Sequence, residues 1–162
     1  MFGQFFEGKT ILVTGVAGVK GTWLGLELLE AGSQVLGLDI RFPQDSNFVA
    51  SGLASRIRFV QGDVTDLNLV CNLLQNVDGV FHLAAVPLVG EAQRNPLQAY
   101  RTNTLGTCTV LDAIRRTQSV RYAVFVTTDK VYRDKKGVPW VETDPLGATS
   151  KIGICEGWMQ AS

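Results

Sequence analysis

The sequence predicts an α/β fold in which a five-stranded parallel sheet is covered by helices on both faces. Short apolar runs alternate along the chain with segments of helical periodicity. The apolar runs carry few polar residues, which is typical of strands buried on both faces of a parallel sheet. The chain has 162 residues, a length that predicts a single domain over residues 1–162.

Each predicted strand is a run of four to six mainly apolar residues. In chain order the strands are expected at 10–14, 34–39, 57–60, 80–84 and 122–126. The last of them is apolar on both sides and is typical of a central strand.

The helices follow from apolar residues that recur three and four positions apart. The first ends at Gly32, the second covers 66–75, the third is a long helix after Pro96 and the last begins near Thr149. A short helix is also expected near Phe48. The residues expected to share one face are Leu24, Leu28 and Ala31 in the first helix, Leu67, Val70, Leu73 and Leu74 in the second, and Tyr100, Thr107, Leu111 and Ile114 in the third.

Right-handed crossovers between these strands give the sheet order 3-2-1-4-5. That order is a Rossmann-like sheet one strand short of the full two-halved arrangement. We therefore expect the C-terminal strands and a substrate lobe to be absent, so that the domain is truncated. The fifth strand then has an open apolar edge, which favours pairing with another chain or aggregation.

Composition excludes several classes of protein. Fifteen basic residues balance fifteen acidic ones, so the basic footprint of a nucleic-acid-binding protein is missing. No apolar run is long enough to span a membrane, and the N-terminus does not resemble a signal peptide. Cys71, Cys108 and Cys155 are scattered, which favours reduced thiols and a cytoplasmic protein. With His82 as the only histidine, no metal site is expected.

A glycine-rich segment joins the first strand to the first helix. Gly15, Gly18 and Gly21 are spaced G-x-x-G-x-x-G, and Val19 lies where the helix begins. Glycines allow a tight turn and a close approach of the backbone to a pyrophosphate, and the helix N-terminus offers free N–H groups to the phosphates. This context predicts a dinucleotide site.

Asp39 ends the second strand, 18 residues beyond Gly21. A carboxylate there can accept hydrogen bonds from the adenosine ribose and repels a 2′-phosphate, which favours NAD over NADP. Arg41 is the opposing signal, because a nearby arginine can hold that phosphate. The alternative for Asp39 is a turn residue after a strand.

Further cofactor contacts are expected at the ends of the third and fourth strands. Asp63 and Val64 lie where an adenine edge would be, although Gly-Asp is also a common turn. Ala84 and Ala85 leave room for the nicotinamide half, although alanines are also ordinary core residues. We interpret His82 as a hydrogen-bonded core histidine rather than a catalytic one.

Several segments together resemble the extended short-chain dehydrogenase/reductase superfamily, which contains the NAD-dependent epimerases and dehydratases. They are 6–9 (FEGK), 13–24 (VTGVAGVKGTWL), 82–89 (HLAAVPLV), 128–132 (TDKVY) and 142–147 (ETDPLG). Residues 20–24 (KGTWL) and the last three segments resemble the CDP-glucose 4,6-dehydratases in particular. The resemblance covers nearly the whole chain but only the N-terminal half of such enzymes.

The resemblance implies a reaction and roles for named residues. In this family NAD takes a hydride from C4 of the sugar, water leaves across C5 and C6, and the hydride returns to C6. Thr128 would hydrogen-bond the C4 hydroxyl, Asp129 would be the acid that helps the C6 hydroxyl to leave, and Lys130 would handle the C5 proton. Asn103 matches an asparagine that supports the site, and its alternative is an inward polar residue bonded to backbone.

The family's Tyr-x-x-x-Lys is incomplete in this chain. Lys151 matches the lysine, but Gly147 stands four residues before it, where the tyrosine is expected. Lys151 has an alternative as a solvated lysine at a helix start. The pair Tyr132 and Lys136 has the same spacing, but we expect it in the loop after the fifth strand and discount it.

Three hypotheses remain open. The first is an NAD-dependent nucleotide-sugar dehydratase that is incomplete or inactive alone, and the second is a non-catalytic NAD-binding module. The third is a truncated relic. The resemblance implies a nucleotide-sugar substrate if a C-terminal lobe completes the site. It also implies a homodimer through the last helix and the long helix after Pro96, which is the fourth when the short helix near Phe48 is counted. No nucleic-acid or membrane partner is expected.

Overall fold

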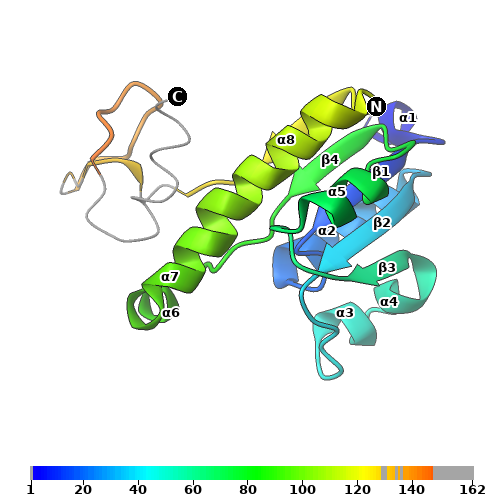
Figure 1. Ribbon diagram of the computed structural model, residues 1–162, viewed down its shortest axis with the longest axis horizontal. Helices are drawn as coiled ribbons and strands as arrows, with labels where there is room; N and C mark the ends of the chain where they lie inside the picture. Colours follow the sequence, from blue (N-terminus) through cyan, green and yellow to red (C-terminus); the bar gives the residue numbers. More distant parts are fainter. Residues whose placement is uncertain (1, 129–130, 134, 136, 148–162) are drawn as a thin grey trace. The chain divides into compact units, whose positions relative to one another are not determined.

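The computed structural model describes residues 2–128, 131–133, 135 and 137–147. Its centre is a five-stranded parallel sheet in the order β3-β2-β1-β4-β5 (Figure 1), which confirms the expected topology. The strands are β1 (Thr10–Thr14), β2 (Gln34–Asp39), β3 (Arg58–Gln61), β4 (Gly79–His82) and β5 (Tyr122–Phe125).

The described helices differ from the expectation mainly in number. They are α1 (Phe2–Phe6), α2 (Val19–Glu30), α3 (Asn47–Ala50), α4 (Leu53–Arg56), α5 (Leu67–Leu73), α6 (Val89–Arg94), α7 (Pro96–Ala99), the π-helix η1 (Tyr100–Gly106) and α8 (Thr107–Thr117). The helices expected before Gly32, near Phe48 and after Asp66 are confirmed as α2, α3 and α5. The helix expected near Thr149 lies outside the described residues. No helix in the described part of the chain is long and apolar enough to cross a membrane.

The alternation of side chains along β1 builds a core on each face of the sheet. Leu12 packs with residues of α5 and α8, whereas Ile11 and Val13 pack with Leu28 of α2 and Phe48 of α3 on the opposite face. Figure 1 shows α2 behind the sheet and α5 in front of it. Both faces of the central strand β1 are therefore buried against apolar side chains, as the apolar strand sequences predict.

The register of the strands aligns their carboxyl ends. Thr14 of β1 lies opposite Leu38 of β2 on one side and opposite His82 of β4 on the other. Loops that leave these three strands therefore start at the same edge of the sheet, which is where ligands bind in open α/β sheets.

Backbone contacts divide the chain into two compact units. The first comprises 1–84 and 106–126 and contains the whole sheet. The second comprises 85–105 and the described part of the segment that follows 126. The single domain predicted from the chain length stays a prediction.

The inward face expected for the long helix after Pro96 is only partly observed. Within α8, Thr107 is buried and Ile114 packs against the core, but Leu111 is 48% exposed while Val110 and Ala113 are buried. Tyr100 is 42% exposed and lies in the seven-residue π-helix η1, whose hydrogen bonds run from i to i+5. A uniform 3.6-residue period cannot describe both segments.

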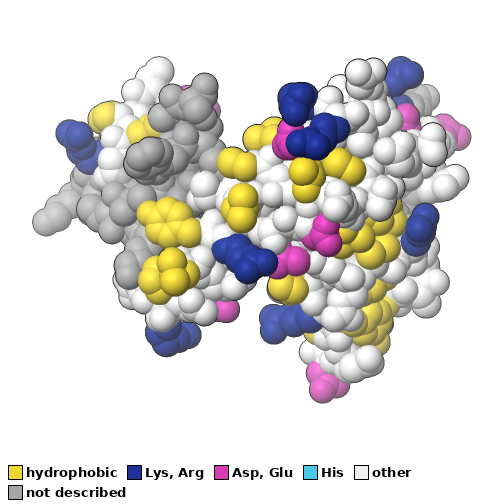
Figure 2. Space-filling model, viewed as in Figure 1, with side chains coloured by type: hydrophobic (Ala, Val, Ile, Leu, Met, Phe, Trp, Pro, Cys, Tyr) yellow, Lys and Arg dark blue, Asp and Glu magenta, His cyan; other side chains and the backbone are white. Residues whose placement is uncertain are grey.

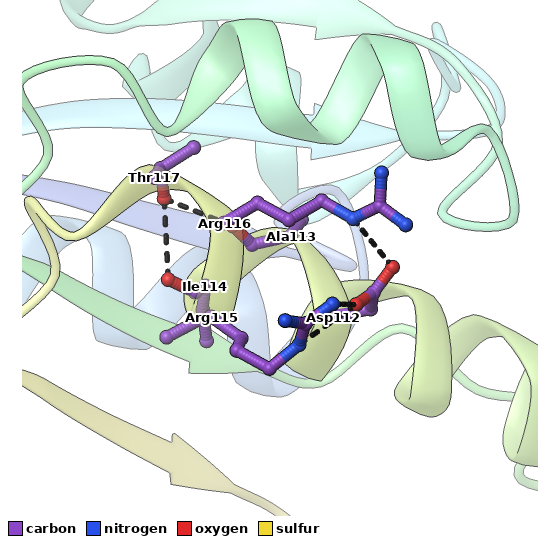
Figure 3. Close-up of polar contacts among 6 residues, drawn as sticks. All are labelled: Asp112, Ala113, Ile114, Arg115, Arg116 and Thr117. Carbon is purple, nitrogen blue, oxygen red and sulfur yellow. Dashed lines mark hydrogen bonds and ion pairs between the residues drawn. The ribbon is translucent and has the colours of Figure 1, made fainter.

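The end of α8 is held by local polar contacts (Figure 3). Asp112 accepts hydrogen bonds from Arg115 (2.6 Å) and from Arg116 (2.7 Å). Hydrogen bonding from Arg115 and then Arg116 lowers the pKa of the Asp112 carboxyl. The hydroxyl of Thr117 donates to the carbonyl oxygen of Ala113 at 2.9 Å. These pairs are exposed to solvent, so they shape the helix end more than they stabilise the fold.

Candidate functional site

The turn between β1 and α2 is possible only because two of its residues are glycine. Gly15 has φ +69°, and a Cβ atom on it would lie 2.8 Å from the amide nitrogen of Ala84 in the loop after β4. A Cβ on Gly21 would lie 2.2 Å from the carbonyl oxygen of Gly15. The first turn of α2 thus rests directly on the backbone of the loop.

The N-terminus of α2 presents backbone donors at the carboxyl edge of the sheet. Gly18 is the N-cap, and the first N–H to find a helical acceptor is that of Thr22, which donates to Gly18 O at 2.9 Å. Within the described residues the N–H groups of Val19, Lys20 and Gly21 have no acceptor. These donors and the positive end of the helix dipole form an arrangement that binds phosphate oxygens.

Asp39 connects the end of β2 to the glycine loop. Its Oδ2 accepts a hydrogen bond from the backbone N–H of Ala17 at 3.0 Å. Its Oδ1 has no partner among the residues that the structure describes. The half-buried carboxylate therefore supports the glycine loop with one of its two oxygens.

Asp63 forms the turn that the sequence analysis gave as the alternative to an adenine contact. Its Oδ1 accepts from the N–H of Thr65 at 2.9 Å, and its carbonyl oxygen accepts from the N–H of Asp66 at 3.0 Å. Val64 is buried in the core cluster that α5 and α8 share. A contact of Asp63 and Val64 with an adenine stays a prediction.

His82 lies inside the first unit and is 4% exposed, and no histidine is visible on the face shown in Figure 2. Its Nδ1 lies 2.7 Å from Oγ1 of Thr14, and its Nε2 lies 3.1 Å from Oγ1 of Thr107. Burial lowers the pKa of the imidazole from its usual 6.5 to about 4. The interpretation of His82 as a hydrogen-bonded core histidine is confirmed.

The sequence analysis placed Thr107 on the inward face of the long helix but assigned no role to its hydroxyl or to that of Thr14. Thr14 and Thr107 are buried, and their hydroxyl groups hold the two nitrogens of His82. The signal that could have found Thr14 is a polar residue at the end of an otherwise apolar strand, since a buried hydroxyl needs a partner. Nothing in the local sequence indicates that Thr107 faces the same histidine.

In the second unit, Asn103 is bonded to the backbone of the loop that begins at Ala85. It is 2% exposed, its Oδ1 accepts from the N–H of Val86 at 2.8 Å, and its Nδ2 donates to Val86 O at 3.4 Å. The backbone-bonded alternative for Asn103 is thus observed, in a π-helix of the kind often found at functional sites. Ala85 is exposed, whereas Ala84 in the first unit is half-buried.

The segment after β5 contains the positions that the family resemblance marks as catalytic. The carbonyl oxygen of Thr128 accepts from the N–H of Val131 at 3.4 Å. Asp129, Lys130 and Lys151 lie outside the described residues. Gly147, which stands in place of the expected tyrosine, donates its N–H to Val131 O at 3.0 Å.

A small antiparallel contact closes this segment. Tyr132 forms an isolated bridge with Leu146, and its ring stacks on Trp140 with 6.4 Å between the centroids. Asp144 is paired with Lys135, and hydrogen bonding from Lys135 lowers the pKa of the Asp144 carboxyl. Tyr132 therefore lies in the loop after β5, as expected, and the Lys136 of its Tyr-x-x-x-Lys spacing lies outside the described residues.

Comparison with known proteins identifies the family. The family model of GDP-mannose 4,6 dehydratase matches residues 12–154. The chain belongs to this family. A CDP-glucose 4,6-dehydratase of Salmonella typhimurium is 33% identical over 158 residues, which are 95% of this chain and 44% of that protein.

Solved structures of such dehydratases and epimerases agree with the fold. A UDP-glucose-4-epimerase from Stenotrophomonas maltophila with bound NAD has a TM-score of 0.84 and 29% identity, and covers 94% of this chain and 47% of its own. A dTDP-glucose 4,6-dehydratase from Streptomyces venezuelae with NAD bound has a TM-score of 0.78 and 31% identity, with coverages of 91% and 48%. The chain spans less than half the length of these relatives, and the resemblance to epimerases and dehydratases is confirmed.

A methyl group at Gly21 should destabilise the glycine loop of this dehydratase-family chain. Alanine normally stabilises a helix relative to glycine, but here its Cβ would collide with Gly15 O. We expect Gly21→Ala to lower the free energy of unfolding by roughly 3 kcal/mol, the cost of overpacking against rigid backbone. Gly90→Ala in α6 is the control, because its Cβ would meet only the end of Arg94, at 3.7 Å. Urea unfolding that ranks Gly21→Ala equal to Gly90→Ala would contradict the close approach.

The burial of neutral His82 should make stability depend on pH. The pKa is near 6.5 in the unfolded chain and about 4 in the fold, so the unfolded state binds the proton first as pH falls. The contribution of neutral His82 to the free energy of unfolding is fully present above pH 6.5. About 3 kcal/mol of this contribution is lost progressively as the pH falls to about 4. Carboxyl groups titrate in the same range, so the measurement is the difference in urea-unfolding free energy between the wild type and His82→Phe at each pH. A difference that does not change with pH would show that His82 is not held neutral.

Proposed function

We propose that this chain binds NAD at the loop between β1 and α2, and that it forms the cofactor-binding part of a nucleotide-sugar 4,6-dehydratase. One observation carries the proposal. Three consecutive N–H groups at the start of α2 have no acceptor within the described residues, and they adjoin a turn that excludes a Cβ atom at Gly15 and Gly21. Such a turn accepts a pyrophosphate without rearrangement.

The residues present fit the cofactor. The pyrophosphate would lie against the backbone of Gly15, Gly18 and Val19, and Oδ1 of Asp39 would accept a ribose hydroxyl while Oδ2 keeps its bond to Ala17. When bound, NAD supplies the hydride acceptor of the family's reaction. The protein's part is to hold the cofactor in place and to exclude a phosphate at the 2′ position.

The preference for NAD over NADP follows from charge. A 2′-phosphate would approach the carboxylate of Asp39, and two anions that close repel each other. Arg41 is exposed, two residues further on, and could compensate only by turning toward that phosphate. We therefore propose NAD as the preferred cofactor and NADP as the less favoured one.

The remaining assignments complete the proposal. Asp63 and Val64 would border the adenine, and Ala84, Ala85 and Asn103 would shape the nicotinamide half. The sugar C4 hydroxyl would bond to Thr128, while Asp129 and Lys130 would handle the C6 hydroxyl and the C5 proton. Lys151 would support proton transfer. The relatives' names favour a nucleotide-sugar substrate, with CDP-glucose as the proposed one.

A second candidate function is a non-catalytic NAD-binding module. The observation that favours it is Gly147, whose backbone is bonded to Val131 where the family's proton-accepting tyrosine is expected. A glycine supplies no hydroxyl to take the proton from the sugar. Both candidates keep the same cofactor site, and a homodimer through α8 and the last helix remains part of the proposal for either.

Calorimetric titration of the full chain with NAD+ and NADP+ tests the cofactor site. We expect NAD+ to bind at least about tenfold more tightly than NADP+, a difference of about 1.4 kcal/mol. Asp39→Asn should remove most of that preference, because the amide keeps the size of the carboxylate but loses its charge. Asp78→Asn is the matched control, since the same change occurs in a carboxylate that accepts from the N–H of Thr10 at the start of β1, at the opposite edge of the sheet.

The outcomes separate the candidates. Absence of NAD+ binding by the folded wild-type chain would refute both of them. With binding established, product formed from CDP-glucose by this chain alone would exclude the non-catalytic module. We expect no product, because Gly147 cannot act as the base.

A further inference from the structure

We propose that His82 is a positioning residue for the cofactor loop. In its neutral form with the proton on Nε2, it links α8 to Thr14, and Thr14 in turn holds the backbone of Leu83 and Ala84 against Gly15. This proposal deepens the NAD site proposed above and rests on it for the effect on NAD affinity. The arrangement of the loop itself does not depend on it.

The hydroxyl of Thr14 sets the direction of the hydrogen bonds. Its Oγ1 accepts from the N–H of Ala84 at 3.2 Å and from the N–H of Leu83, which it shares with the carbonyl oxygen of Thr14, also at 3.2 Å. A hydroxyl has two acceptor sites and one proton to donate. With both acceptor sites in use, the remaining contact at 2.7 Å has Thr14 donating to Nδ1 of His82.

The tautomer of His82 follows from that direction. A nitrogen that accepts a hydrogen bond carries no proton, so the neutral ring has its proton on Nε2. The Nε2–H then donates to Oγ1 of Thr107 at the start of α8, 3.1 Å away. A proton on Nδ1 would face an oxygen whose acceptor sites are already occupied, which disfavours the charged ring independently of burial.

The chain of hydrogen bonds ends at the turn on which the proposed NAD site depends. The amide nitrogen of Ala84, held by Thr14, is the atom nearest to the Cβ position of Gly15, at 2.8 Å. The loop after β4 and the glycine loop therefore pack backbone to backbone. If Ala84 shifts by a few tenths of an ångström, Gly15 and the start of α2 must adjust with it.

The single histidine makes the tautomer directly measurable. The chain contains no histidine other than His82, so histidine-selective nitrogen-15 labelling of the untagged full chain yields one imidazole signal pair. We expect the chemical shift of an unprotonated nitrogen at Nδ1 and that of a protonated nitrogen at Nε2, without change between pH 8 and pH 5.5. A proton on Nδ1, or titration near the usual pKa, would overturn the proposal.

Variants test whether the link positions the loop. His82→Phe keeps a ring in the core but removes both hydrogen bonds, and we expect amide hydrogen exchange at Leu83 and Ala84 to accelerate and the NAD+ dissociation constant to rise about tenfold. His82→Asn places an acceptor where Nδ1 was and should restore most of the amide protection. The matched control is Thr109→Val, which removes a buried hydroxyl from the same helix that is not a hydrogen-bond partner of His82.

Each result decides one of the two proposals. Unchanged protection of the Leu83 and Ala84 amides in His82→Phe would show that the histidine only fills space. Equal losses of NAD+ affinity in His82→Phe and Thr109→Val would show a general loss of stability instead of positioning. If the wild type binds no NAD+, the cofactor proposal fails, and the tautomer and the amide exchange still decide the role of His82.

Discussion

The architecture of the site depends on one close approach, that of the first turn of α2 to the backbone of Gly15. The Cβ of any other residue at position 21 would lie 2.2 Å from the carbonyl oxygen of Gly15, so the contact exists only with glycine. It places the helix N-terminus at the carboxyl edge of β1, where the first N–H groups have no acceptor within the described residues. Asp39 then reinforces the same turn from β2 through the N–H of Ala17. The phosphate site that we propose is thus formed by the backbone itself.

Much of this could be predicted from the sequence, because the strongest signals are local. Buried parallel strands are continuous apolar runs, and the crossover rule then leaves little freedom in the strand order. Gly15, Gly18 and Gly21 can be recognised in the sequence because the steric exclusion of a Cβ atom, which selects glycine, acts over only a few residues. The position of Asp39 follows from the alignment of strand ends, which the topology alone provides.

What could not be predicted depends on contacts between distant residues or on an irregular backbone. The π-helix η1, which contains the exposed Tyr100, has no marker in the sequence, and Leu111 of α8 is exposed although the sequence placed it on the inward face. The link between His82 and Thr107 joins residues 25 positions apart through a hydroxyl that local patterns do not reveal. Asp63 is ambiguous for a different reason, because an aspartate at this position is expected both in a turn and at an adenine contact.

The distribution of the site along the chain separates cofactor binding from turnover. Every group that we assign to the pyrophosphate and to the ribose lies between Gly15 and Asp39, within the unit that contains the sheet. The proposed catalytic positions begin at Thr128, after β5, in the other unit. The first set is supported by the core on both faces of β1, and no residue from the described part of the segment after β5 belongs to that core. A change at Gly147 or at Thr128 can therefore abolish chemistry without altering the phosphate-binding turn, and an inactive chain would still be expected to bind NAD.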